Sequence, residues 1–474
     1  MLFNSLQFLI FFIVVTTLYY IIPHRSRWLL LLISSCYFYM SFVPIYIFIL
    51  VFTIVIDYFA GLAIENAKNK RRKLLLLVSL IANIGVLAVF KYYNFAINNM
   101  SVFFGYLGLP AKIPYLSILL PIGLSFHTFQ AMSYTIEVYR GNQKAEKHFG
   151  IYALYVMFYP QLVAGPIERP QNLLHQFYEK KRFNYIQVTN GLKLMLWGLF
   201  KKVVIADRLS VYVNTVYNHV GSKEFTSLTY IFATVLFSFQ IYCDFSGYSD
   251  IALGAAEVIG FRLMKNFNRP YFSKNIREFW SRWHISLSTW FRDYLYIPLG
   301  GNRVKLFRWI INLLIIFVIS GFWHGANYTY IIWGALHGFY MIIGVLIGKI
   351  GFETIKTSNN AIIVFFKIIG VFMLVSFAWI FFRANSLTDA FNIIRYIFTW
   401  QKGLFIGTVQ SLIYSFFGLF ILLIAELKNE YFPNAFSFSN SRYIGVRWGY
   451  YLILIVIILS FGVFNNSQFI YFQF

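Results

Sequence analysis

Charged residues are scarce in this sequence, and acidic residues are the scarcest of them. Only 12% of the 474 residues are Asp, Glu, Lys or Arg, whereas 59% are hydrophobic. A soluble protein carries about 25% charged residues, so this chain has too little polar surface to cover a water-soluble globule. The composition therefore argues against a soluble protein and predicts one that is embedded in a membrane.

The charge that is present is strongly unbalanced. Lys and Arg together number 40 against 17 Asp and Glu, which gives a formal net charge of +23. A basic excess is also a mark of nucleic-acid binding. Here, however, the basic residues lie in short segments between apolar runs, a pattern typical of cytoplasmic loops that face anionic lipid. We therefore expect contact with membrane lipid and no nucleic-acid partner.

Cysteine and the common cofactor motifs are almost absent. The two cysteines, Cys36 and Cys243, both lie in apolar runs and offer neither a disulfide framework nor metal-ligand spacing. The sequence has no Walker A, GxGxxG, HExxH or GxSxG motif. We therefore expect no bound metal and no bound cofactor.

Long apolar runs, in contrast, recur along the whole chain. The first, Leu2–Ile22, lacks the basic start and cleavage site of a secretory signal, so we expect it to be retained as a helix. The next, Trp28–Ile56, is too long for one span and contains Pro44, which should divide it. Since a span needs about 20 apolar residues, we predict about 11 spans in all. The remaining runs lie at roughly 74–90, 113–136, 149–165, 186–205, 226–262 (one element or more), 305–323, 326–348, 361–383, 404–425 and 448–464.

The basic clusters predict the orientation. Segments 24–27 and 65–73 should be cytoplasmic, which places the N-terminus outside. Arg442 and Arg447 precede the last run and should also be cytoplasmic, which places the C-terminus outside. We therefore expect residues 1–464 to form a single membrane domain and residues 465–474 an extracytoplasmic aromatic tail.

The stretch 262–308 is more polar than the runs around it and is dense in Arg and Trp. Within it, His284, Leu287 and Phe291 recur at helical spacing, and so do Trp280 and Trp283. Such a helix is too polar to face lipid. We expect it to lie at the cytoplasmic interface or to enter the protein from that side as a re-entrant element.

Two of the eight histidines lie in sequence surroundings that are not typical of surface residues. His324, in SGFWHG, has apolar runs on both sides, and His284 lies in FWSRWHISLS. An ionisable side chain at membrane depth normally faces a cavity or pathway, and a neutral imidazole there can act as a general base. The glycines beside His324 should let a ligand approach the backbone closely. A hydrogen-bonded structural role is the alternative for both histidines, and is the better interpretation for His127 and His337.

Five long segments resemble one family. They are PIGLSFHTFQAMSYTIEVYRG, MFYPQLVAGPIERP, FSFQIYCDFSGYSDIALGAAEVIGFRLMKNFNRPY, NIREFWSRWHISLSTWFRDYLYIPLGGN and SGFWHGANYTYIIWGALHG. Together they resemble the membrane-bound O-acyltransferases, in particular the bacterial branch that acylates cell-envelope polysaccharides, over roughly residues 1–385. The resemblance implies an all-α integral membrane fold in the bacterial cytoplasmic membrane. Its helices form a ring around a central funnel, with re-entrant or interfacial helices added.

The resemblance also implies residue roles. His324 matches the catalytic histidine and His284 a second family histidine. The tail FIYFQF resembles an aromatic C-terminal motif in related acylation systems, where a tyrosine carries the acyl group, so Tyr471 becomes a candidate acyl acceptor. A membrane-interface anchor is the alternative reading of this tail. A phenol, with pKa about 10, makes an ester more activated than an alkyl ester, which suits a carrier.

The same segments supply further candidates. Those for substrate binding are Trp283, Arg292, Trp323 and Asn327, and those for orienting a histidine or arginine are Asp244 and Asp293. Buried ion pairs are the alternative for the two acids, and an arginine that extends to the membrane surface is the alternative for Arg292.

The expected reaction moves an acetyl group from cytoplasmic acetyl-CoA, through Tyr471, to a separate extracytoplasmic esterase-like transferase that acetylates an envelope polysaccharide. Peptidoglycan is the favoured acceptor, because the C-terminal end looks less like the longer alginate proteins. Alginate or another exopolysaccharide, D-alanyl transfer from a carrier protein, and a non-catalytic transporter or flippase are the alternatives.

Overall fold

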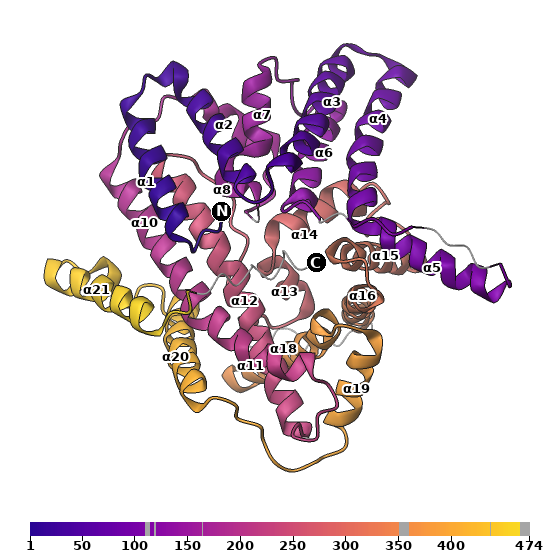
Figure 1. Ribbon diagram of the computed structural model, residues 1–474, viewed down its shortest axis with the longest axis vertical. Coiled ribbons are helices and arrows are strands. Elements are labelled where there is room, and N and C mark those ends of the chain that lie inside the picture. Colours follow the sequence, from indigo (N-terminus) through magenta and orange to yellow (C-terminus); the bar gives the residue numbers. More distant parts are fainter. Residues whose placement is uncertain (110–113, 118–119, 164, 350–359, 437, 465–474) are drawn as a thin grey trace. The chain divides into compact units, whose positions relative to one another are not determined.

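All regular structure in the described part of the chain is helical, as the sequence predicts (Figure 1). The computed structural model describes residues 1–109, 114–117, 120–163, 165–349, 360–436 and 438–464. Among them, eight helices are long and apolar enough to cross a membrane, and a shorter apolar helix covers Leu6–Ile21. The total of about 11 spans and the ring around a funnel stay predictions.

The chain divides into two compact units, each of which combines distant segments of the sequence. Unit 1 contains Met1–Met195 and Ile251–Met264, and unit 2 contains Leu196–Asp250 and Lys265–Phe474. The single membrane domain over residues 1–464 stays a prediction, and the tail 465–474 lies outside the described residues.

The helices between residues 6 and 199 include long helices and short turns. They are α1 (Leu6–Ile21), α2 (His24–Met40), α3 (Ile47–Asn66), α4 (Asn69–Leu87), α5 (Tyr93–Tyr106), α6 (Leu124–Arg140), α7 (Phe149–Met157), α8 (Tyr159–Leu162), α9 (Pro170–Leu173) and α10 (Tyr185–Leu199).

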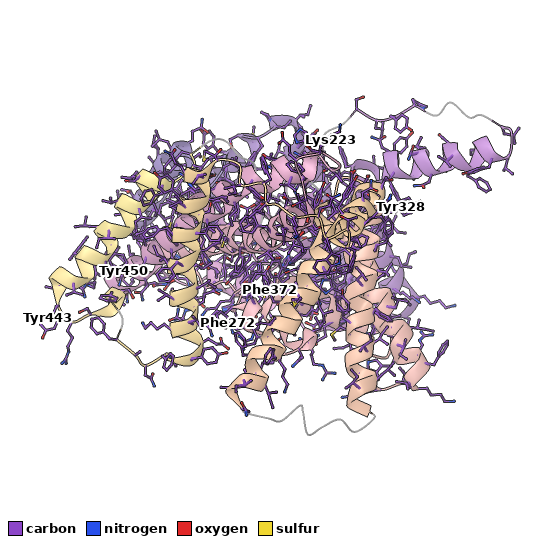
Figure 2. All side chains as sticks on the ribbon, turned by 90° about the horizontal axis from the view of Figure 1, so that it is seen from below. Lys223, Phe272, Tyr328, Phe372, Tyr443 and Tyr450 are labelled. Carbon is purple, nitrogen blue, oxygen red and sulfur yellow. The ribbon has the colours of Figure 1, made fainter. Side chains whose placement is uncertain are left out.

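The later helices and the turns between them contain the candidate residues His284 and His324. They are α11 (Asp207–Asn218), α12 (Ser227–Val258), α13 (Ile276–Arg282), α14 (Ile285–Phe291), α15 (Leu306–His324), α16 (Tyr328–Lys349), α18 (Ala361–Arg383), α19 (Leu387–Ile397), α20 (Val409–Tyr431) and α21 (Ile444–Phe461). Figure 2 labels Tyr443, which directly precedes α21, and Tyr450 within it.

Prolines divide the apolar runs in two places. The break expected at Pro44 is confirmed, because α2 ends at Met40 and α3 begins at Ile47. The run at 149–165 was expected to be one span, and this prediction is wrong. Its helix α7 has nine residues, so it extends only about 14 Å, and Pro160 lies in the first turn of the separate helix α8 (Tyr159–Leu162). A bilayer core is about 30 Å thick.

The run at 226–262 forms one element. Its helix α12 continues without interruption for 32 residues, although it contains Asp244 and Asp250. Both acids are paired with lysines of the helical segment Phe200–Ala206, Asp244 with Lys202 and Asp250 with Lys201. Because the charges are neutralised inside the protein, the helix needs no break to bring them to water.

Candidate functional site

His284 occupies a break between two short helices. The helical spacing across 280–291 predicts one helix, but α13 ends at Arg282 and α14 begins at Ile285. His284 itself lies in the left-handed region, with φ 42° and ψ 56°. A residue with a side chain rarely adopts this conformation, and such positions cluster at functional sites.

The irregular segment that contains Asn266 and Asn268 holds this break in place. The backbone N–H of Ile285 donates to the carbonyl of Asn266 at 2.9 Å, and the N–H of Asn268 donates to the carbonyl of Arg282, also at 2.9 Å. These bonds satisfy backbone groups that a continuous helix would have paired internally. The left-handed turn at His284 is therefore stabilised by Asn266 and Asn268, which precede it in the sequence and lie outside both short helices.

The imidazole of His284 is enclosed by aromatic rings. The side chain is buried, and its ring centroid lies 4.7 Å from that of Phe245 and 6.4 Å from that of Trp323. Burial lowers the pKa of His284 to about 3. The imidazole is therefore neutral at physiological pH, as a general base must be before it accepts a proton.

His324 is the last residue of α15 and is buried where three helices meet. Its ring centroid lies 4.9 Å from that of Trp323, 5.0 Å from that of Trp333 on α16, and 5.3 Å from that of Phe382 on α18. The next residue, Gly325, is extended and ends the helix at the histidine.

The glycines around His324 serve helix packing, so the expectation that they admit a ligand is wrong. A Cβ added to Gly321 would lie 2.2 Å from the carbonyl oxygen of Tyr330 and 3.2 Å from the Cα of Gly334. A Cβ added to Gly325 would lie 2.2 Å from the ring of Tyr330. These glycines let α15 and α16 approach each other closely.

His337 belongs to the same aromatic cluster, although its sequence environment favours a purely structural role. Its ring centroid lies 5.1 Å from that of Trp333 and 5.0 Å from that of Trp280, and it stacks on Phe279 at 6.2 Å. The side chain is fully buried, and neither ring nitrogen has a hydrogen-bond partner among the described residues. The available signal was its spacing of four residues from Trp333, which places both on one helix face.

Three histidines and two tryptophans therefore form one continuous series of ring contacts within unit 2. The series runs His284, Trp323, His324, Trp333 and His337, with successive centroid distances of 6.4, 4.9, 5.0 and 5.1 Å. The two histidines predicted from the sequence are thus brought into one buried cluster, with a single indole between them.

Comparison with known proteins identifies the family of this chain. The model of the membrane-bound O-acyltransferase family matches residues 148–383, which include His284 and His324. A probable alginate O-acetylase of Pseudomonas aeruginosa is 37% identical over 436 residues, or 88% of this chain and 82% of the relative. The peptidoglycan O-acetyltransferase of Helicobacter pylori is 36% identical over 395 residues, or 77% and 72%.

This chain belongs to the membrane-bound O-acyltransferase family. The resemblance carried by its five motifs is confirmed, and the chain is a multi-pass membrane enzyme of the O-acyltransferase class. A more distant relative, the teichoic acid D-alanyltransferase of Bacillus subtilis, is 28% identical over 46% of this chain and 58% of its own.

The other candidate residues of the acyltransferase are more dispersed. Trp283 is buried and packs against Trp379 at 5.1 Å between centroids, so it forms part of the wall of the cluster. The side chain of Asn327, the residue before α16, accepts the backbone N–H of Thr329 at 3.1 Å. Arg292 and Asp293 pair with each other at 2.8 Å, with side chains 59% and 29% exposed, in contrast to the buried histidines.

Asp244 lies in a buried ion-pair network of the acyltransferase. The ammonium of Lys202 lies 2.6 Å from Asp244 and 2.8 Å from Asp207, and all three side chains are at most 5% exposed. Lys202 belongs to a π-helical segment, Phe200–Ala206, a rare conformation that is frequent at functional sites. The residue after Asp244 is Phe245, whose ring contacts His284. The network therefore positions the part of α12 that packs on this histidine.

Proposed function

We propose that this enzyme moves an acetyl group from a cytoplasmic thioester, acetyl-CoA, to the outer side of the bacterial cytoplasmic membrane for O-acetylation of an envelope polysaccharide. The observation that supports this is the placement of both family histidines, His324 and His284, in one buried aromatic cluster. A dry, ring-lined surrounding protects an acyl group from hydrolysis while it is transferred.

In the proposed step, His324 is the general base. It takes the proton of the attacking hydroxyl group, whose oxygen forms an ester bond to the acyl carbon. The bond between the acyl carbon and sulfur breaks, and the thiol leaves with the proton. His284, neutral and held in its left-handed turn, positions the donor or assists the proton transfer.

We further propose that Tyr471 supplies the first hydroxyl group. Tyr471 lies outside the described residues, but the segment that leads to it is held within unit 2, which also carries both histidines. The N–H of Val463 donates to the carbonyl of Val203 at 2.9 Å, and the guanidinium of Arg208 donates to the carbonyl of Phe461 at 2.8 and 2.5 Å. A separate extracytoplasmic transferase of the esterase type would take the acetyl group from this tyrosine to the polysaccharide.

The acceptor polysaccharide is either peptidoglycan or an exopolysaccharide such as alginate. The preference for peptidoglycan rested on the C-terminal end of the chain. The probable alginate O-acetylase of Pseudomonas putida, however, aligns over the whole of both chains at 34% identity. That reason for preferring peptidoglycan therefore no longer holds. Measuring ester-linked acetate on both polymers, in cells with and without the gene, identifies the acceptor.

Mass spectrometry of the C-terminal peptide tests the acyl carrier. The purified chain is incubated with acetyl-CoA, and wild type is compared with His324→Ala, Tyr471→Phe and the control His219→Ala, which removes an exposed histidine. We expect one acetyl adduct in wild type and His219→Ala and none in the other two variants. An adduct that persists in His324→Ala would contradict the proposed base, and its absence from wild type would leave the tail as a membrane anchor.

Transfer of D-alanine is the second candidate, favoured by the match to the Bacillus subtilis teichoic acid D-alanyltransferase. It would use the same histidine with an aminoacyl group. The same spectra distinguish the two reactions when cells supply the donor, because alanyl and acetyl adducts differ in mass.

A further inference from the structure

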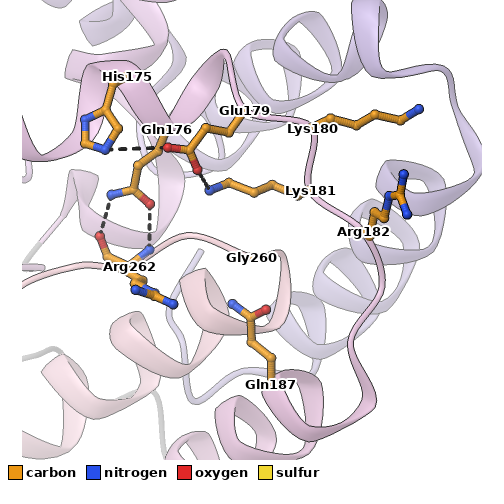
Figure 3. A pocket seen from close by; sticks show the side chains of 9 residues that line it. All are labelled: His175, Gln176, Glu179, Lys180, Lys181, Arg182, Gln187, Gly260 and Arg262. Carbon is orange, nitrogen blue, oxygen red and sulfur yellow. Dashed lines mark hydrogen bonds and ion pairs between the residues drawn. The ribbon is translucent and has the colours of Figure 1, made fainter.

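A cavity in unit 1 gathers basic side chains that the proposed acyl transfer does not use. Its volume is about 380 Å³, within the range of about 300–1,000 Å³ that is usual for small-ligand sites. Three segments surround it, namely 175–182 after α9, the first turn of α10 at Gln187, and residues 260–262 after α12 (Figure 3).

The wall of this cavity is built by specific hydrogen bonds. The amide of Gln176 donates to the carbonyl of Arg262 at 2.9 Å, and the backbone N–H of Arg262 donates back to the Gln176 carbonyl oxygen at 2.9 Å (Figure 3). Gly260, with φ 91°, lies against Lys181, because a Cβ at this position would lie 3.1 Å from the Cβ of Lys181. The three segments are therefore held around the cavity by defined contacts.

The charge of the lining is strongly positive. Its basic residues are Lys180, Lys181, Arg182 and Arg262, with His175 beside them, and its acidic residue is Glu179. The Glu179 carboxylate already binds the Lys181 ammonium at 2.5 Å and faces the His175 ring at 3.7 Å. The hydrogen bond from Lys181 lowers the pKa of Glu179, so this carboxylate is ionised and is already paired with Lys181.

The other three cations of the lining are not neutralised by ion pairs among the described residues, although the charge of Arg262 helps to lower the pKa of Glu179. In the described part of the chain, neither Lys180 nor Arg182 nor Arg262 forms an ion pair with a carboxylate. A general surplus of basic residues on one side of a membrane would be spread over its loops. Here the basic residues are concentrated around one cavity. Guanidinium groups bind phosphate oxygens through two parallel hydrogen bonds.

We propose that this cavity binds the phosphate groups of a ligand, with Lys180, Arg182 and Arg262 as the cationic partners and the Gln187 amide as a neutral one. Two further contacts join it to residues 24–27, which form the first turn of α2. The His24 ring hydrogen-bonds the Tyr178 carbonyl at 3.3 Å, and Arg27 donates to the Lys181 carbonyl at 2.6 Å. Since that segment is expected to be cytoplasmic, the phosphate comes from a cytoplasmic nucleotide, such as the nucleotide part of coenzyme A, or from an anionic lipid of the inner leaflet.

The test uses the purified full-length chain and two probes. Adenosine 3′,5′-bisphosphate, titrated into lipid-free detergent solution, reports nucleotide binding. Native mass spectrometry after release from nanodiscs that mix phosphatidylglycerol with phosphatidylcholine reports a retained anionic lipid. The variant Arg262→Gln is compared with Arg71→Gln, which removes an exposed arginine of α4 and gives the same net charge.

We expect one probe to bind wild type and Arg71→Gln equally and to bind Arg262→Gln roughly tenfold more weakly, about 1.4 kcal/mol. Which probe does so identifies the source of the phosphate. Equal binding of both probes by Arg262→Gln and Arg71→Gln, with both variants showing wild-type thermal unfolding, would overturn the proposal. Neither assay involves acyl transfer, so the result is independent of the function proposed for His324.

Discussion

The imidazole of His324 meets the indole of Trp333 almost edge-on, with ring centroids 5.0 Å apart and planes at 88°. The same indole contacts His337 at 5.1 Å. Trp333 therefore lies between a family histidine and a second buried histidine of the same cluster, and its shape determines the position of both rings.

Replacement of this indole should affect transfer more than folding when a ring is kept. Trp333→Phe retains an aromatic ring but leaves space beside His324, so we expect acyl transfer to fall roughly tenfold, about 1.4 kcal/mol. Trp333→Ala should also cost about 3–5 kcal/mol of stability, because it empties a buried site. Initial rates and thermal unfolding measure the two effects. Trp448→Phe, at an exposed position on α21, is the control, and equal rates in the two Phe variants would contradict the positioning role.

For the buried imidazole of His337, we predict an effect on stability. Since neither ring nitrogen has a partner among the described residues, the group carries an uncompensated polar cost of about 1–3 kcal/mol. His337→Phe preserves the stacking on Phe279 and should raise the unfolding temperature or leave it unchanged. A lower unfolding temperature would show that a polar partner, such as water or substrate, binds this ring. Thermal unfolding of the two proteins in the same detergent decides the matter.

Because Glu168 is a buried acid, we expect the stability of unit 1 to depend on pH. Its carboxylate accepts the backbone N–H of Met264, and burial raises its pKa to about 7. The folded protein thus favours the protonated acid, while the unfolded chain releases the proton near pH 4.5. The contribution to stability is therefore complete below about pH 4.5 and is lost as the pH rises to about 7.

Replacing the carboxyl group of Glu168 with a neutral amide tests the direction of this pH dependence. Glu168→Gln should stabilise the protein by roughly 2 kcal/mol at pH 8 and have little effect at pH 5. Unfolding curves at the two pH values provide the measurement, with Glu224→Gln, at an exposed position, as the control. A stabilisation that is the same at both pH values would show that the titration of Glu168 is not its cause.

The close contact of α15 and α16 predicts a steric effect. A Cβ at Gly321 would lie 2.2 Å from the Tyr330 carbonyl oxygen, a backbone atom that cannot move aside cheaply. Gly321→Ala should therefore lower stability by about 1–3 kcal/mol and disturb the nearby His324. Gly370→Ala, on α18, adds its methyl group to open space and serves as the matched control. Equal thermal unfolding of the two variants would show that the helices separate without cost.

Several features could be predicted from the sequence because they depend on local properties. The scarcity of charge indicated a membrane protein, Pro44 indicated the break between α2 and α3, and the motifs around His284 and His324 indicated the family. These signals are the overall composition and short local patterns, and they do not depend on which distant segments meet.

Other features depend on contacts between remote segments, and only the tertiary structure decided them. His284 leaves helical geometry because Asn266 pairs with the next residue, a bond that periodicity does not report. Tyr330 fills the space beside the glycines that flank His324, and Asp244 forms an ion pair with Lys202. An apolar pattern by itself determines that a segment is buried, since burial follows from composition. It does not determine the neighbours of a buried side chain, because these depend on how the helices pack against one another.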